Sequence, residues 1–140
     1  MAVAKSFRDL QVYQLARESA KMVFDASKLF PREERYSLTD QIRRSSRAVG
    51  AMIAEAWARR RYRAAVINKI DEAMGEAMET QSWLDTAIDA GYLAESQFRE
   101  FDSRYQAVGG KLTRMIDRAD DFCKFAPGTD YRAQSGKRVE

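Results

Sequence analysis

Hydrophobic residues recur every three or four positions in four stretches of this chain, and short polar links separate the stretches. This spacing places the hydrophobic residues of each stretch on one face of an α-helix. It predicts helices over residues 9–29, 38–60, 63–90 and 95–125. The links are short enough to turn each helix back along the one before it. The pattern therefore predicts an all-α protein folded as an antiparallel up-down-up-down four-helix bundle.

Local signals predict where these helices begin and end. Asp9 is a suitable N-cap for the first helix, whose buried stripe is expected to reach Leu29 before Pro31 ends it. The pair Gly109–Gly110 interrupts the last stretch without changing its hydrophobic phase, so one continuous helix is expected there. The residues expected at the centre of the core are Ile42, Val49, Ile53, Ile70, Leu84, Val108 and Leu112.

Length and composition add the domain organisation. A chain of 140 residues with 45% hydrophobic and 32% charged residues is typical of one soluble globular domain. We expect the bundle to span residues 1–125. Residues 126–140 show no periodicity and are expected to form a flexible tail.

The residue types exclude most kinds of catalytic site. The chain has no histidine, so a Ser-His-Asp triad, the common zinc sites and histidine-containing di-iron sites are excluded. The single cysteine, Cys123, falls on the expected core side and is interpreted as an inert thiol in a reducing compartment. No hydrophobic run approaches the roughly 20 residues of a membrane span, and the first residues do not resemble a secretory signal. We expect a cytoplasmic protein that is not an enzyme, with no catalytic residues, no metal, no cofactor and no membrane partner.

Charge is concentrated in one stretch. Net charge is only +3, yet residues 43–63 hold seven arginines and a single acid, Glu55. This face is either simply solvated or a binding surface. Four arginines at its end form a candidate nucleic-acid site, with Trp57 or Tyr62 available for base stacking: Arg59, Arg60, Arg61 and Arg63.

The outward faces of the second and third helices form a candidate subunit interface. Alanines between the arginines would let another backbone come close, and three glutamates with a tryptophan lie on the third helix. The glutamates could be solvated, could hold a divalent cation, or could pair with the arginines of a neighbouring subunit. The last alternative predicts a head-to-tail contact that closes a ring. The candidate interface comprises Arg43, Arg44, Arg47, Ala51, Ala54, Ala58, Glu72, Glu76, Glu79 and Trp83.

Three segments carry a resemblance to a known family: SFRDLQVYQLA at 6–16, LFPREERYSLTDQIRRSSRAV at 29–49 and ETQSWLDTAIDAGYL at 79–93. Together with Ile53-Ala54-Glu55, they resemble the four helix bundle protein family. This family is also called the 23S rRNA intervening-sequence protein family, or by an older ribosomal protein-like name. The resemblance covers about residues 6–123. The family usually has Pro-Ala-Asn-Ile-Ala-Glu-Gly where this chain has Gly50-Ala51-Met52-Ile53-Ala54-Glu55-Ala56.

The resemblance implies a small bacterial cytosolic bundle that assembles as a ring-like homo-oligomer, a homopentamer, with no established catalytic activity. Two functions remain open. The first is an oligomer that binds nucleic acid, RNA before DNA, through its arginines. The alternative is a structural or protein-interaction scaffold whose arginines serve its own assembly.

Overall fold

A computed structural model describes residues 4–124, and every regular element in that range is helical. The four long helices are α1 (Gln11–Ser27), α2 (Leu38–Ala58), α3 (Arg63–Asp89) and α4 (Glu95–Asp117). Three short elements accompany them: the 3-10 helices η1 (Phe7–Asp9) and η2 (Arg32–Glu34), and the helix α5 (Ala119–Lys124). No strand occurs among the described residues, so the predicted all-α class is confirmed. The predicted tail 126–140 lies outside them.

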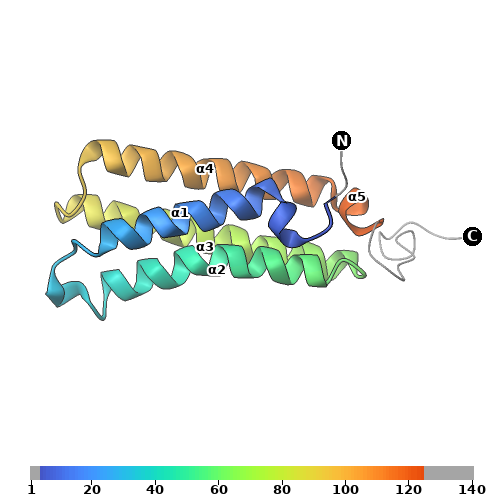
Figure 1. Cartoon of the computed structure of the whole chain (residues 1–140), viewed down its shortest axis with the longest axis horizontal. Coiled ribbons are helices and arrows are strands. Elements are labelled where there is room, and N and C mark those ends of the chain that lie inside the picture. The colour runs from blue at the N-terminus through green and yellow to red at the C-terminus, as the bar shows by residue number, and fades with distance from the viewer. Residues whose placement is uncertain (1–3, 125–140) are drawn as a thin grey trace, which may run out of the picture.

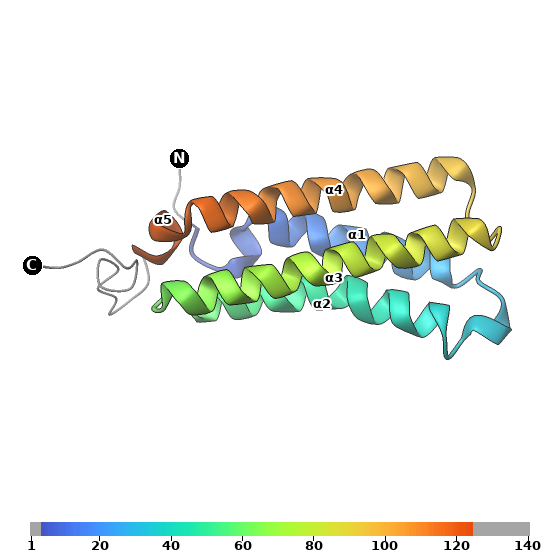
Figure 2. The same cartoon turned by 180° about the vertical axis from the view of Figure 1, so that it is seen from behind.

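The long helices run alternately along the same axis, as Figures 1 and 2 show. Among the long helices, the pairs in contact are α1–α2, α2–α3, α3–α4 and α1–α4. Each long helix therefore packs against two neighbours around one core. The α2–α3 turn and α5 lie at one end of the bundle, whereas η2 and the α3–α4 link lie at the other (Figure 1).

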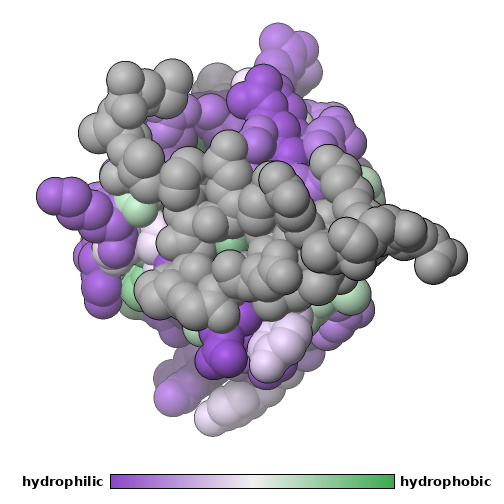
Figure 3. Space-filling view, turned by 90° about the vertical axis from the view of Figure 1, so that its right-hand side faces the viewer, coloured by the Kyte–Doolittle hydropathy of each residue, from purple (hydrophilic) through white to green (hydrophobic). Residues whose placement is uncertain are grey.

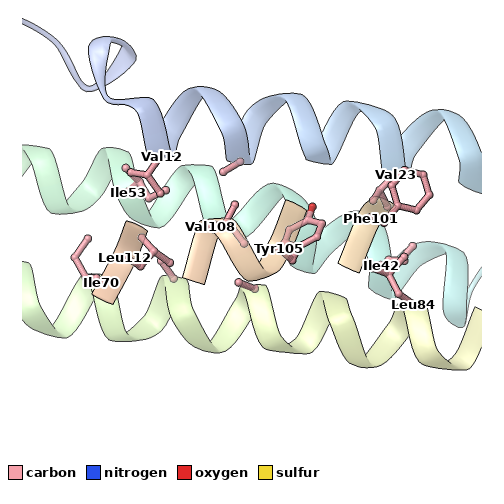
Figure 4. Close-up of a cluster of buried hydrophobic side chains, with 14 of the residues drawn as sticks. Val12, Val23, Ile42, Ile53, Ile70, Leu84, Phe101, Tyr105, Val108 and Leu112 are labelled. Atoms are coloured by element: carbon pink, nitrogen blue, oxygen red, sulfur yellow. The ribbon is translucent and has the colours of Figure 1, made fainter. Parts of the chain in front are cut away.

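The core lies along the bundle axis and contains mostly aliphatic residues (Figure 4). All seven residues predicted for its centre are at most 1% exposed. The α2–α3 contact also includes a polar pair, because the hydroxyl oxygens of Ser45 and Thr80 lie 2.8 Å apart and are buried. Hydrogen bonding compensates the cost of burying these two groups. Cys123 is buried, as predicted.

The predicted start and end of the first helix are wrong. Asp9 does not cap α1; its carboxylate accepts hydrogen bonds from the backbone N–H groups of Lys5 and Ser6 and closes a capping box around η1. The N-cap of α1 is Leu10, which makes no side-chain capping bond. At the other end α1 stops at Ser27, so Leu29 falls outside the helical stripe and is 84% exposed.

The predicted single helix at the C-terminal end of the bundle is divided in two. Gly109–Gly110 lies inside α4 without a break, while the helix ends at Asp117 and α5 starts at Ala119. The second helix is also shorter than predicted, because α2 ends at Ala58. The cluster of arginines predicted at its end therefore spans a turn between two helices.

Candidate nucleic-acid interface

The four arginines of the predicted nucleic-acid site have different surroundings. Arg60 folds back on α2: its Nε donates to the Trp57 carbonyl at 3.0 Å, and its guanidinium lies 3.5 Å from the centroid of the Trp57 ring. Burial lowers the pKa of Arg60, which nevertheless stays charged because guanidinium pKa values are so high. Arg63 is the first residue of α3 and donates from Nε to Asp120 Oδ1 at 2.8 Å. These two arginines are engaged within the chain.

The other two arginines of the turn are open to solvent. Arg59 and Arg61 are both exposed, and neither has an ion-pair partner among residues 4–124. Arg61 lies 5.8 Å from the ring of Tyr62, which is itself 57% exposed. Exposed guanidinium groups without acidic partners are the groups able to contact phosphate.

The structure adds three cations that the sequence prediction missed. Lys111, Arg114 and Arg118 lie at the end of α4, at the same end of the bundle as the α2–α3 turn (Figure 1). Lys111 donates to Gln11 Oε1 at 3.4 Å, whereas the exposed Arg114 and Arg118 form no ion pair within the described range. The signal available in the sequence was their spacing of three and four residues, which places them on one face of the predicted helix. We call Arg59, Arg61, Lys111, Arg114 and Arg118 the basic end.

A hollow of about 690 Å³ lies beside the basic end. Hydrophobic residues from α1, α2, α4 and α5 line it, among them Leu10, Trp57, Met115 and Phe122. The rings of Trp57 and Phe122 meet edge to face, with centroids 5.8 Å apart. Figure 3 looks onto this end of the molecule and shows hydrophilic residues around its rim, with hydrophobic patches between them.

The charge at the hollow is predominantly positive. Arg60, Lys111, Arg114 and Arg118 all line it. Two acids also line it, Asp9 and Asp121. The Asp9 carboxylate already accepts two backbone hydrogen bonds, and Asp121 has an interaction partner as well. The arrangement suits a ligand that combines an apolar surface with negative charge.

The residues predicted for the subunit interface form contacts within the chain. Arg44 donates from Nη1 to Glu76 at 3.2 Å and from Nη2 to Glu79, and Trp83 Nε1 donates to Glu79 Oε2 at 3.1 Å. Hydrogen bonds to Glu76 and Glu79 raise the pKa of Arg44, and the Trp83 hydrogen bond followed by that of Arg44 lowers the pKa of Glu79. Glu72 pairs with Lys69 at 2.9 Å. These acids have partners inside one protomer.

The remaining basic residues of that surface pack against an aromatic ring. The guanidinium of Arg43 lies 4.5 Å, and that of Arg47 5.0 Å, from the ring centroid of Phe24. Arg43 also donates to Ser27 Oγ at 2.7 Å. Ala51 and Ala58 are exposed, and Ala54 is half-buried. No group of three or more acidic, histidine or cysteine side chains in the described part of the chain is placed to hold a metal ion.

A groove of about 380 Å³ runs between α1 and α2. Small residues form much of its surface: Ala16, Ala20, Ser46, Gly50 and Ala51. Tyr13 and Phe24 also line it, together with the cations Arg17, Lys21 and Arg47. Only Ala51 and Arg47 of these residues belong to the predicted interface. The α1 half of the groove was missed, because only the packed helices bring it beside α2.

Comparison with known proteins decides the family. A family model described as "23S rRNA-intervening sequence protein" matches residues 8–114. The chain belongs to this family. It is also similar to a solved protein of unknown function of the S23 ribosomal protein family from Bacteroides thetaiotaomicron. The two share 29% sequence identity with a TM-score of 0.68, over 75% of this chain and 97% of that one. A search among curated proteins found no match.

These findings agree with the resemblance expected from the sequence. The matched segment contains α1, α2 and α3 and most of α4. No described helix combines the length and the hydrophobicity needed to cross a lipid bilayer.

Proposed function

We propose that this 23S rRNA-intervening sequence family protein is a non-enzymatic, cytoplasmic nucleic-acid-binding protein, with RNA as the favoured ligand. The observation that carries the proposal is the convergence of exposed cations from two distant parts of the sequence at one end of the bundle. Arg59 and Arg61 come from the α2–α3 turn, Arg114 comes from α4, and Arg118 is the residue between α4 and α5. The name of the family adds the link to ribosomal RNA.

The expected binding is mainly electrostatic. Each phosphate contact releases condensed counterions. The logarithm of the binding constant therefore falls linearly with the logarithm of the salt concentration, with a slope of about 0.9 per contact on duplex DNA and about 0.7 on single strands. Arg60 and Arg63 contribute little to such contacts, because one stacks on Trp57 and the other pairs with Asp120. The candidate phosphate-binding residues are therefore those of the basic end.

The test is a binding titration of labelled RNA and DNA over a salt series. The informative variant replaces Arg59, Arg61, Arg114 and Arg118 with glutamine. The matched control removes four positive charges from the opposite end of the bundle, by glutamine at Lys28, Arg32, Arg35 and Arg99. We expect loss of binding in the first variant only. Failure of the parent protein to bind either nucleic acid at about 50 mM salt would contradict the proposal.

Assembly into a ring-like homo-oligomer is the second part of the proposal, and five copies is the number implied by the resemblance. The α1–α2 groove offers small residues flanked by cations. The solvent-facing side of α3 carries the complementary groups. Met78 is 60% exposed there, and the exposed acids Asp71 and Asp85 lie two turns before and after it. A methionine entering a groove of alanines and glycine, with carboxylates beside Arg17 and Lys21, is a complementary head-to-tail contact.

The alternative function, a scaffold whose arginines serve its own assembly, is favoured by the position of Arg47 in that groove. The two functions use different arginines. If the protein assembles through the groove and binds no nucleic acid, the scaffold replaces the nucleic-acid-binding function. Light scattering together with the titration separates these outcomes.

A further inference from the structure

We infer that the hollow beside the basic end is a pocket for unpaired nucleotides, in which an aromatic base enters the hollow and its phosphate contacts the cations around it. This inference rests on the proposed function and makes it more specific. It predicts a preference for single-stranded over duplex RNA.

The first support is the composition of the hollow. Its volume of about 690 Å³ falls within the range of small-molecule pockets, roughly 300–1,000 Å³. Trp57, Met115 and Phe122 give it an apolar interior, whereas Arg114, Arg118 and Lys111 lie around it. A nucleotide has a flat aromatic base next to a negatively charged phosphate. The base matches the apolar residues of the hollow, and the phosphate matches its cations.

The second support is the fixed stack of Arg60 on Trp57. The guanidinium is held 3.5 Å from the ring centroid and anchored by its bond to the Trp57 carbonyl, while Phe122 holds the indole from another side. Proteins that bind unpaired RNA stack bases on aromatic rings and on guanidinium planes. Here an aromatic ring and a guanidinium plane are already stacked on each other before a ligand binds, so little ordering is required for a base to extend the stack.

The third support is the partial burial of the same groups. Trp57 and Phe122 are half-buried, and Arg60 is half-buried although it is charged and has no acidic partner in the described range. A charged group that is partly removed from water without a counter-ion gains from an anion nearby. A phosphate held by Arg118 would bring negative charge near Arg60, because both side chains line the same hollow.

Duplex RNA cannot use this pocket in the same way. Its bases are stacked and paired inside the helix, and extruding one costs a few kcal/mol. Duplex binding would be limited to contacts between phosphates and the basic end.

The experiment uses the full chain with Trp83→Phe, which leaves Trp57 as the only tryptophan. Three ligands are titrated at low salt while Trp57 emission is recorded: single-stranded RNA of about ten nucleotides, the duplex of the same sequence, and AMP. We expect the single strand to quench Trp57 and to bind about tenfold or more tightly than the duplex. If AMP quenches Trp57 at a similar concentration, the pocket also accepts free nucleotides. If only the single strand quenches Trp57, the pocket requires the polymer. Both results support the pocket.

A second variant separates stacking from charge. Trp57→Leu keeps a hydrophobic residue, and its affinities are measured with labelled RNA because emission from Trp57 is lost. We expect single-strand affinity to fall about tenfold while duplex affinity stays unchanged. The emission measurement does not depend on whether this variant folds. Equal affinity for the two forms, with unchanged Trp57 emission, would overturn the pocket and leave the proposed nucleic-acid binding intact. Absence of any RNA binding would overturn both.

Discussion

Arg63 and Asp120 form an ion pair that joins the first residue of α3 to α5, with 2.8 Å between Nε and Oδ1. Each side chain is about one-third exposed. The pair lies next to the only cysteine of the chain, Cys123, since Arg63 and Asp120 both influence its pKa. Burial raises the pKa of this thiol. Cys123 therefore serves as a probe of how firmly α5 is held.

Replacing Arg63 with glutamine should loosen α5 without unfolding the bundle. An ion pair that is one-third exposed contributes little to global stability, about 1 kcal/mol or less, so the thermal midpoint should change by only a few degrees. Local opening of α5 should become more frequent, and Cys123 should react with a thiol reagent several times faster. Arg99→Gln, which breaks an ion pair with Glu95 at the far end of the bundle, should leave that rate unchanged. An unchanged rate in Arg63→Gln would show that the pair does not hold α5.

Two leucines provide a direct test of the core. Leu84 is 1% exposed, and its replacement by alanine should reduce the free energy of unfolding by about 2–5 kcal/mol. Leu29 is 84% exposed, and Leu29→Ala should change it by less than about 0.5 kcal/mol. Denaturant unfolding of both variants gives the comparison. A similar loss in both would place Leu29 in a contact outside this protomer.

The same two leucines show what the sequence could predict. Leu84 lies in the middle of a long helix, where the hydrophobic period alone determines which side faces the core. Leu29 continues the period of α1, but the helix stops two residues earlier, and helix ends depend on local turns that the period does not contain. The division between α4 and α5 was missed for the same reason, because no proline or glycine marks Arg118.

The candidate site was predictable only in its local part. The four arginines at 59–63 are clustered and visible in the sequence, whereas Arg114 and Arg118 join them through the antiparallel packing of α4. The hydrophobic pattern of the sequence also does not show which charged side chains form ion pairs. Sequence alone did not indicate that Arg63 pairs with Asp120, 57 residues away.

Glycines in two settings give opposite predictions. Gly110 lies inside α4 and is exposed, and an added Cβ would meet only Arg114 Nη1 at 3.9 Å. Gly110→Ala should stabilise the protein by about 0.5–1 kcal/mol, because alanine restricts the unfolded chain and favours helix. Gly91 follows α3 with φ of 80°, so Gly91→Ala should be destabilising by about 1 kcal/mol. Thermal unfolding that shifts both variants in one direction would contradict these assignments.

The network around Glu79 predicts a pH dependence. Hydrogen bonds from Trp83 and Arg44 lower the pKa of Glu79 in the folded state. A lowered folded-state pKa means that this contribution is present above the unfolded pKa near 4.5 and is lost as pH falls through the folded value. Glu79→Gln should therefore be less stable than the parent at pH 7, by under about 1 kcal/mol because solvent screens the pair, and should match the parent near pH 3. A difference that is the same at both pH values would show that the carboxylate charge is not involved.

The last prediction concerns assembly through Met78. If this side chain enters the α1–α2 groove of the next protomer, then Met78→Arg brings a fourth positive charge to a contact where Arg17, Lys21 and Arg47 already line the groove. Like charges at an interface core cost several kcal/mol, so the variant should become monomeric at micromolar concentration.

The control introduces an arginine at an exposed position of α4, outside the proposed contact. Gln106 is exposed on α4, away from the groove, and Gln106→Arg should leave the oligomer unchanged. Light scattering measures both variants, and helical content by circular dichroism shows that each remains folded. A second variant, Ala20→Arg, fills the groove itself and should have the same effect as Met78→Arg. If Ala20→Arg dissociates the oligomer and Met78→Arg does not, the groove receives a different part of the neighbouring chain. If neither changes the mass of an assembled parent, the interface lies elsewhere on the bundle.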